Sequence, residues 1–219
     1  MNRYDLCRIE RYDHYVKQTY RNRCIIASAN GPLALTVPIE RGDSSSTSRS
    51  LMKDIRISDH GNWRHIHWQA LVSAYGESPF FEYYADDLRP FFERRWDFLF
   101  DFNLEITQCI CSLLDVRTTL MLTDEYRKTD DLAHPMASPQ LLHVGTSAED
   151  VAPLLAPEAL ANTPCDDFRD IILPKNAPLD PSFESKPYYQ VYRHKYDFQH
   201  NLSILDLLLN EGNAAICWL

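Results

Sequence analysis

The sequence predicts an α/β or α+β fold, a single domain in which a mixed β-sheet packs with several amphipathic helices. Three observations predict it: short apolar runs typical of strands, longer stretches with helical periodicity, and a hydrophobic content of 45% over 219 residues. A chain of this length can form one domain, because a single core extends to roughly 250 residues. Connections by short turns and by helices are both present, which makes a mixed sheet the expected arrangement.

The first quarter of the chain is predicted to be mainly strand. Four short runs rich in β-branched and apolar residues are the expected strands: 6–10, 23–29, 33–39 and 53–57. Asn30-Gly31-Pro32 is a tight-turn signal between the second and third of them. The serine- and threonine-rich stretch 41–49 predicts a polar loop before the fourth.

Helical spacing begins at Asn62. Six residues at this spacing form the predicted buried stripe of a helix over 62–75: Trp63, Ile66, His67, Ala70, Leu71 and Ala74. Gly76 is expected to end this helix, and Ser78-Pro79 to turn the chain. A short helix near 86–94, a longer helix over 99–114 and a strand at 118–123 are predicted to follow.

The second half of the chain is less regular. Residues at about 124–167 combine five prolines with acidic side chains and predict an irregular excursion, with one short helix at 151–160. Strands are expected at 168–173, 188–192 and 214–219. Before the last of these, Ser203 and Asp206 form a capping-box pattern for a final helix, which Gly212 ends.

The net charge and the absence of known motifs exclude several classes of binding partner. A net charge of −9 argues against nonspecific binding to nucleic acid or to an anionic membrane. No apolar stretch approaches the roughly 20 residues of a membrane span, and the first residues lack the apolar core of a signal peptide, so a cytoplasmic protein is expected. The six glycines are too scattered for a dinucleotide or phosphate-loop motif, and no cofactor is predicted.

Residues 17–23 are a candidate anion site. Lys17, Arg21, Asn22 and Arg23 place three cations and an amide just before the second predicted strand, and such donors bind phosphate or carboxylate. The alternative is structural, because the same side chains can solvate a loop or pair with acidic residues.

His67 is the candidate proton carrier. It lies on the apolar stripe of the predicted helix, where it is either a hydrogen-bonded core histidine or a pocket histidine that gives and takes a proton. His65 lies two residues away, which on a helix turns its ring by about 200°, so no shared metal site is predicted. An aromatic cluster of the same region completes the candidate residues: Trp63, Tyr75, Phe80 and Tyr84.

Several segments, in order and spacing, resemble the WbqC-like protein family: Tyr20-Arg21-Asn22-Arg23 with the run GPLALTVP at 31–38, the run 62–84, PYYQV at 187–191 and NLSILDLL at 201–208. The chain resembles a Bacteroidetes-type member over most of 4–122 and 166–212. Similar members carry an additional N-terminal segment, so we expect this chain to be a shortened form of a longer reading frame. The resemblance implies a setting in surface polysaccharide or modified-sugar biosynthesis, and it carries no catalytic residues over to this chain.

Two functions from different classes follow. The first is a transferase acting on a small anionic donor or an activated amino-sugar, with a nucleotide-sugar or an acyl donor as ligand. In it, Lys17, Arg21 and Arg23 hold the anion while His67 assists proton transfer. The second is a noncatalytic binding or assembly protein of a glycan pathway, with aromatic residues at 80, 81, 83 and 84 as its surface. A third and weaker hypothesis is a metal hydrolase.

Overall fold

The computed structural model describes residues 1–40, 50–126, 140–144, 166–169, 171–174 and 185–219. Its larger sheet has three strands in the order β1 (Leu6–Ile9), β4 (Thr118–Leu122) and β5 (Gln140–Val144). β1 runs parallel to β4, and β5 runs antiparallel to it, so the predicted mixed sheet is confirmed. The central strand β4 is buried along its whole length, as a strand with neighbours on both sides should be.

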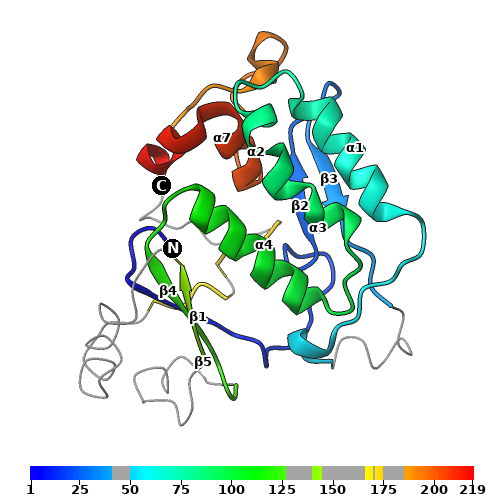
Figure 1. The fold of residues 1–219 in the computed structure, drawn as a ribbon, viewed down its shortest axis with the longest axis vertical. Helices are drawn as coiled ribbons and strands as arrows, with labels where there is room; N and C mark the ends of the chain where they lie inside the picture. The colour runs from blue at the N-terminus through cyan, green and yellow to red at the C-terminus, as the bar shows by residue number, and fades with distance from the viewer. Residues whose placement is uncertain (41–49, 127–139, 145–165, 170, 175–184) are drawn as a thin grey trace.

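A separate hairpin contains β2 (Arg23–Ile26) and β3 (Leu33–Thr36), which pair antiparallel with Arg23 opposite Thr36. Gly31 in their connection has a φ of +97°, a conformation that glycine adopts without steric cost. Figure 1 shows the two sheets at opposite ends of the molecule, with α1 beside the hairpin. Both strands of the hairpin and its turn are confirmed.

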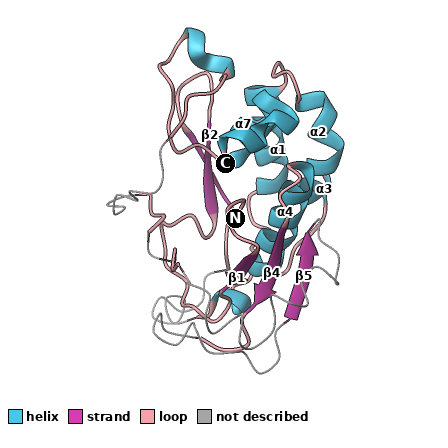
Figure 2. Ribbon diagram, turned by 90° about the vertical axis from the view of Figure 1, so that its left-hand side faces the viewer, coloured by secondary structure: helices cyan, strands magenta, loops and turns pink. Residues whose placement is uncertain are grey.

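Five α-helices are described: α1 (Trp63–Tyr75), α2 (Phe81–Leu88), α3 (Pro90–Glu93), α4 (Leu99–Leu113) and α7 (Ile204–Glu211). Figures 1 and 2 show them gathered beside the strands, with α4 next to the three-stranded sheet. None of the helices in the described ranges is long and apolar enough to cross a bilayer.

The helix predicted from Asn62 is confirmed, and its buried face is shifted toward Tyr75 relative to the predicted stripe. Trp63, His67, Leu71 and Ala74 are buried, whereas Ile66 is 57% exposed. At about 100° per residue, Ile66 lies at the margin of the stripe that these four residues form. Its predicted place in the core is therefore wrong.

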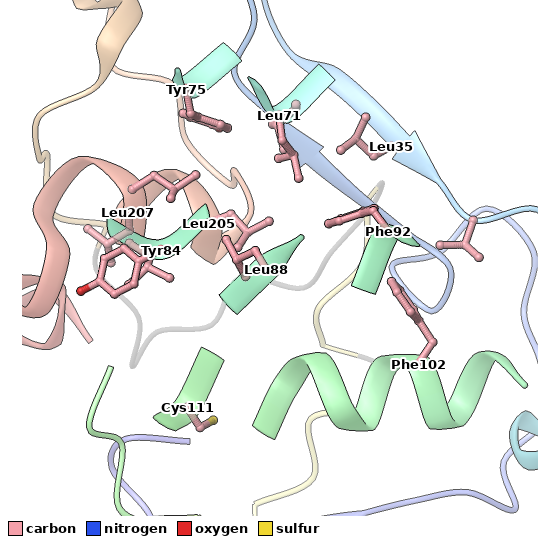
Figure 3. Packing of buried hydrophobic residues seen from close by; sticks show 14 of the residues in the cluster. Leu35, Leu71, Tyr75, Tyr84, Leu88, Phe92, Phe102, Cys111, Leu205 and Leu207 are labelled. Carbon is pink, nitrogen blue, oxygen red and sulfur yellow. The ribbon is translucent and has the colours of Figure 1, made fainter. Parts of the chain in front are cut away.

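One hydrophobic core joins these helices to the hairpin. Figure 3 shows side chains from α1, α2, α3, α4, α7 and β3 pointing into it, among them Leu71, Leu88 and Leu205. Leu71, Leu88, Leu208 and Leu209 are each at most 1% exposed. Burying a leucine side chain stabilises the fold by about 1.5–3 kcal/mol, so this core is the main support of the helical half.

Several predicted elements are wrong. Stretches predicted as strands fold in part as 3₁₀ helices: Met52–Asp54, Val191–His194 and Gly212–Trp218. The described residues of 168–173 form turns and bends, and β5 lies inside the stretch predicted to be irregular. A short apolar run does not distinguish strand from helix when its partner is unknown. The helix predicted at 151–160 lies outside the described residues.

The short helix predicted near 86–94 begins earlier and is divided. Phe81, Tyr84 and Leu88 are buried at helical spacing and make α2 a helix from Phe81 onward. Pro90 then occupies the first turn of α3, where its missing N–H costs nothing.

The start and end of α7 follow the prediction, and its capping box does not. The Ser203 hydroxyl accepts a hydrogen bond from the Leu205 N–H at 3.3 Å, and Gly212 ends the helix with a φ of +60°. Asp206, predicted to complete the box, is instead fully buried. Its carboxylate accepts hydrogen bonds from the Tyr188 hydroxyl at 2.7 Å and the Gln190 amide at 3.1 Å. These three residues form what we call the Asp206 network.

Candidate functional site

A pocket lies where β1 and β4 end. Because the two strands are parallel, their carboxyl ends meet at the same edge of the sheet, the usual place for ligands in such sheets. The pocket has a volume of about 460 Å³ and is lined by residues that follow these strands, together with Leu51: Tyr12, Asp13, His14, Asp124, Glu125 and Tyr126. We call it the strand-end pocket.

Hydrogen bonds fix the two chain segments that form its walls. The Thr123 hydroxyl donates to Glu10 Oε1 at 2.8 Å, and the Tyr12 N–H donates to the same oxygen at 2.7 Å. Arg11 Nε donates to the Thr123 carbonyl at 2.7 Å. The segment after β1 is thereby tied to the segment after β4, which makes the edge a rigid support for side chains.

The lining of the strand-end pocket combines carboxylates, phenols and an imidazole. Asp124 and Glu125 supply acceptors, and Tyr12 and Tyr126 supply aromatic faces with a hydroxyl at the tip. His14 adds an imidazole, whose ring nitrogens can donate and accept hydrogen bonds. Such a lining suits a ligand rich in hydroxyl or amino groups.

Asp13 connects the strand-end pocket to Arg21. Its carboxylate forms an ion pair with Arg21, with 2.5 Å between Arg21 Nη2 and Asp13 Oδ2. Burial raises the pKa of the Tyr15 hydroxyl, and the charges of Arg23 and Arg21 act on it in the opposite direction. Both guanidinium groups therefore lie near Tyr15. We call Arg21 and Arg23 the arginine pair.

The four predicted anion-binding residues have different environments. Lys17 is exposed, and the Asn22 side-chain amide is buried and donates to the Val37 carbonyl at 2.9 Å. Asn103 donates to the Arg21 carbonyl at 2.8 Å, so the backbone that carries the arginine pair is held by two asparagines. The structure thus pairs Arg21 with Asp13 and gives Asn22 a structural hydrogen bond.

His67 lies in the core, outside the lining of the strand-end pocket. Its ring centroid is 5.2 Å from that of Trp63 and 6.5 Å from that of Phe92. Burial lowers its pKa to about 4, and a contact with the backbone of Thr36 opposes this in part. Thr36 is also the residue opposite Arg23 in the hairpin. The role of His67 in proton transfer stays a prediction.

The buried imidazole predicts acid sensitivity. The pKa of His67 is lowered to about 4 from 6.5. Between pH 6.5 and 4 the imidazole is therefore protonated in the unfolded chain and neutral in the folded chain. Stability should therefore fall by up to about 3 kcal/mol as the pH drops from 6.5 to 4. Urea denaturation across this range should show a shallower fall for His67→Gln. His65→Gln, at an exposed position of the same helix, should keep the wild-type dependence, and equal curves for both variants would contradict the prediction.

The predicted aromatic residues all belong to the hydrophobic core: Trp63, Tyr75 and Tyr84 are buried in it, and Phe80 packs against it. Trp63 packs edge-on against Phe102, with 6.0 Å between ring centroids, and Phe80 packs against Tyr84 at 6.5 Å. The Tyr75 hydroxyl accepts a hydrogen bond from the Ala27 N–H at 3.1 Å. Trp63, Tyr75 and Tyr84 are core residues.

The aromatic surface predicted for an assembly protein is correspondingly small. Phe81 and Tyr84 are buried and Phe80 is partly buried, so Tyr83, which is 71% exposed, is the one fully exposed member of that set.

Sequence reasoning missed the residues of the strand-end pocket. Their signal is the position of polar side chains directly after two apolar strands, 6–10 and 118–123. That signal becomes meaningful only when the two strands are known to be parallel neighbours.

Comparisons with known proteins are informative about the family. A family model described as "WbqC-like protein family" matches residues 5–217. The chain is 26% identical over 204 residues to "Uncharacterized protein Rv1507c" of Mycobacterium tuberculosis, over 92% of this chain and 81% of that protein. No solved structure matches the chain.

Proposed function

This chain belongs to the WbqC-like protein family, and from that premise we propose that it is a transferase of surface-polysaccharide or modified-sugar biosynthesis. Its substrate in this proposal is an activated amino-sugar, such as a nucleotide-sugar that carries an amine. The observation that carries the proposal is the strand-end pocket, which adjoins Arg21 of the arginine pair through Asp13.

The two parts of the site suit the two parts of such a ligand. Asp124 and Glu125 can accept hydrogen bonds from sugar hydroxyls and from an ammonium group, while Tyr12 and Tyr126 offer faces against which a sugar ring packs. The arginine pair can hold an anionic group attached to the sugar. An amino-sugar activated by phosphate joins these two chemistries in one molecule.

The proposed chemistry is group transfer onto the amine. The amine nitrogen attacks the carbonyl carbon of an acyl donor, an amide bond forms, and the bond from the acyl group to its leaving group breaks. His14 takes the proton that the amine loses and returns it to the leaving group. We assign this role to His14 because it lines the strand-end pocket, whereas His67 is buried among aromatic rings.

The alternative is a noncatalytic protein that binds the same ligand. The carboxylate and tyrosine lining of the pocket would support recognition equally well without turnover. The two functions differ in one measurable respect, which is whether a bound amino-sugar is converted.

A ligand comparison tests the proposal. A nucleotide-activated amino-sugar should raise Tm in a thermal-shift assay, because a ligand that binds only the folded state stabilises it. The same nucleotide-sugar with a hydroxyl in place of the amine should raise it less. Glu125→Gln should weaken binding of the amine ligand by about tenfold, or about 1.4 kcal/mol.

Glu82→Gln is the matched control, because Glu82 is an exposed glutamate of α2 outside the pocket lining. It should bind like the wild type. If nucleotide-sugars with and without the amine both leave Tm unchanged, the chain does not act on an activated amino-sugar.

A further inference from the structure

Arg23 carries an unusual guanidinium group. Its Nε–H is buried and has no hydrogen-bond acceptor among the residues that the structure describes. No ion pair joins Arg23 to a carboxylate in the described ranges either. The side chain as a whole is half-buried. A buried N–H without an acceptor destabilises a fold, since it loses its hydrogen bonds to water and gains none in return. Its presence therefore needs an explanation.

The surroundings of Arg23 add positive charge and rigidity. Arg21 lies near the same Tyr15 hydroxyl, and Asp13 is its ion-pair partner. Two guanidinium groups and one carboxylate leave an excess of one positive charge here, in a chain whose net charge is −9. Tyr15 is 3% exposed, and the backbone between the two arginines is fixed by Asn22 and Asn103.

We propose that Arg23, together with Arg21 and the Tyr15 hydroxyl, binds a phosphoryl group of the ligand. This inference rests on the proposed function, because the phosphoryl group belongs to the activated sugar whose hydroxyl and amino groups occupy the strand-end pocket. Two guanidinium forks match the several oxygens and the double charge of a phosphate better than the two oxygens of a carboxylate. Asp13 takes part by orienting Arg21 between the pocket and the phosphoryl site.

The first arm of the test is inorganic pyrophosphate, measured by calorimetry on the full chain. Arg23→Met should lower the affinity by about 10- to 100-fold, because charged hydrogen bonds are lost. Arg23→Lys keeps the positive charge and loses the two-pronged donor geometry of the guanidinium group. Its affinity for pyrophosphate should lie between those of Arg23→Met and the wild type. Acetate should bind more weakly than pyrophosphate to the wild type.

The second arm is the stability of the ligand-free protein. Arg23→Met keeps an unbranched chain of similar length and removes the unpaired donor, so its urea midpoint should equal or exceed that of the wild type. Arg117→Met is the matched control: Arg117 is 70% exposed, lies just before β4 at the opposite end of that strand, and pairs with Asp115. It should leave pyrophosphate affinity unchanged.

The outcomes distinguish a failure of the phosphoryl site from a failure of the proposed transferase function. If Arg23→Met binds pyrophosphate like the wild type, or lowers the midpoint strongly, the phosphoryl site is wrong even where amino-sugar nucleotides bind and turn over. If Arg23→Met loses pyrophosphate while no amino-sugar nucleotide binds to the wild type, the phosphoryl site stands and the proposed function fails.

Discussion

His14→Gln is expected to lower the turnover of an amino-sugar nucleotide by about 10²- to 10⁴-fold, the range that a positioned general base contributes. Glutamine keeps a polar side chain in the strand-end pocket and cannot take the proton of the attacking amine. Ligand affinity should change little, because the lost interaction acts in the transition state. The measurement is the rate constant kcat with the nucleotide that gives the largest thermal shift, together with its Kd.

His60→Gln serves as the control, since His60 is an exposed histidine outside the pocket lining. It should keep the wild-type rate. An unchanged kcat in His14→Gln would show that His14 is not the general base. A lower kcat in His67→Gln alone would identify His67 as the general base.

Asp206→Ala is expected to lower the free energy of unfolding by about 3–5 kcal/mol, the largest stability change we predict. The substitution leaves the Tyr188 hydroxyl and the Gln190 amide without their shared acceptor and opens a cavity at a fully buried position. Urea denaturation followed by circular dichroism measures the effect. Asp86→Ala, at an exposed position of α2, should change stability by less than about 0.5 kcal/mol.

The contribution of Asp206 to stability should depend on pH, and its sign follows from the pKa of the carboxyl group. Burial raises the pKa of the Asp206 carboxyl, and hydrogen bonds from Tyr188, Tyr75 and Gln190 oppose that rise. The folded state therefore holds this proton more tightly than the unfolded state, so the contribution of Asp206 to stability grows as the pH falls through the folded pKa. The difference between wild type and Asp206→Asn should widen on acidification. A difference that narrows would mean that the carboxylate is held mainly in its charged form.

Sequence periodicity predicted the parts of the fold that depend on neighbouring residues. The helix from Trp63, the helix from Leu99, the hairpin and the Ser203 cap all follow from local spacing and turn chemistry. The wrongly predicted elements are those whose secondary structure depends on contacts with distant parts of the chain. The sequence predicts an apolar strand at 214–219, yet Gly212–Trp218 form a 3₁₀ helix after α7, with Ala215 in the core.

The candidate site shows the same division. Arg21 and Arg23 could be singled out because their charges are adjacent in the sequence. The strand-end pocket could not, because Tyr12 and Tyr126 are separated by more than a hundred residues and meet only through the pairing of β1 with β4. The position of His67 on the buried face followed from spacing, whereas its distance from the pocket depended on how α1 packs.

The parallel pairing of β1 with β4 also bears on how the protein folds. Leu6 pairs with Thr119, so the chain must close a loop of more than a hundred residues before this ladder forms. Such closure is entropically costly and slow, whereas the hairpin and the helices form from local contacts. The helical half should therefore reach its native packing first, with the β1–β4 ladder among the last parts to assemble. Recovery of ligand binding during refolding would then lag behind recovery of helical circular dichroism, because the strand-end pocket exists only once that ladder is complete.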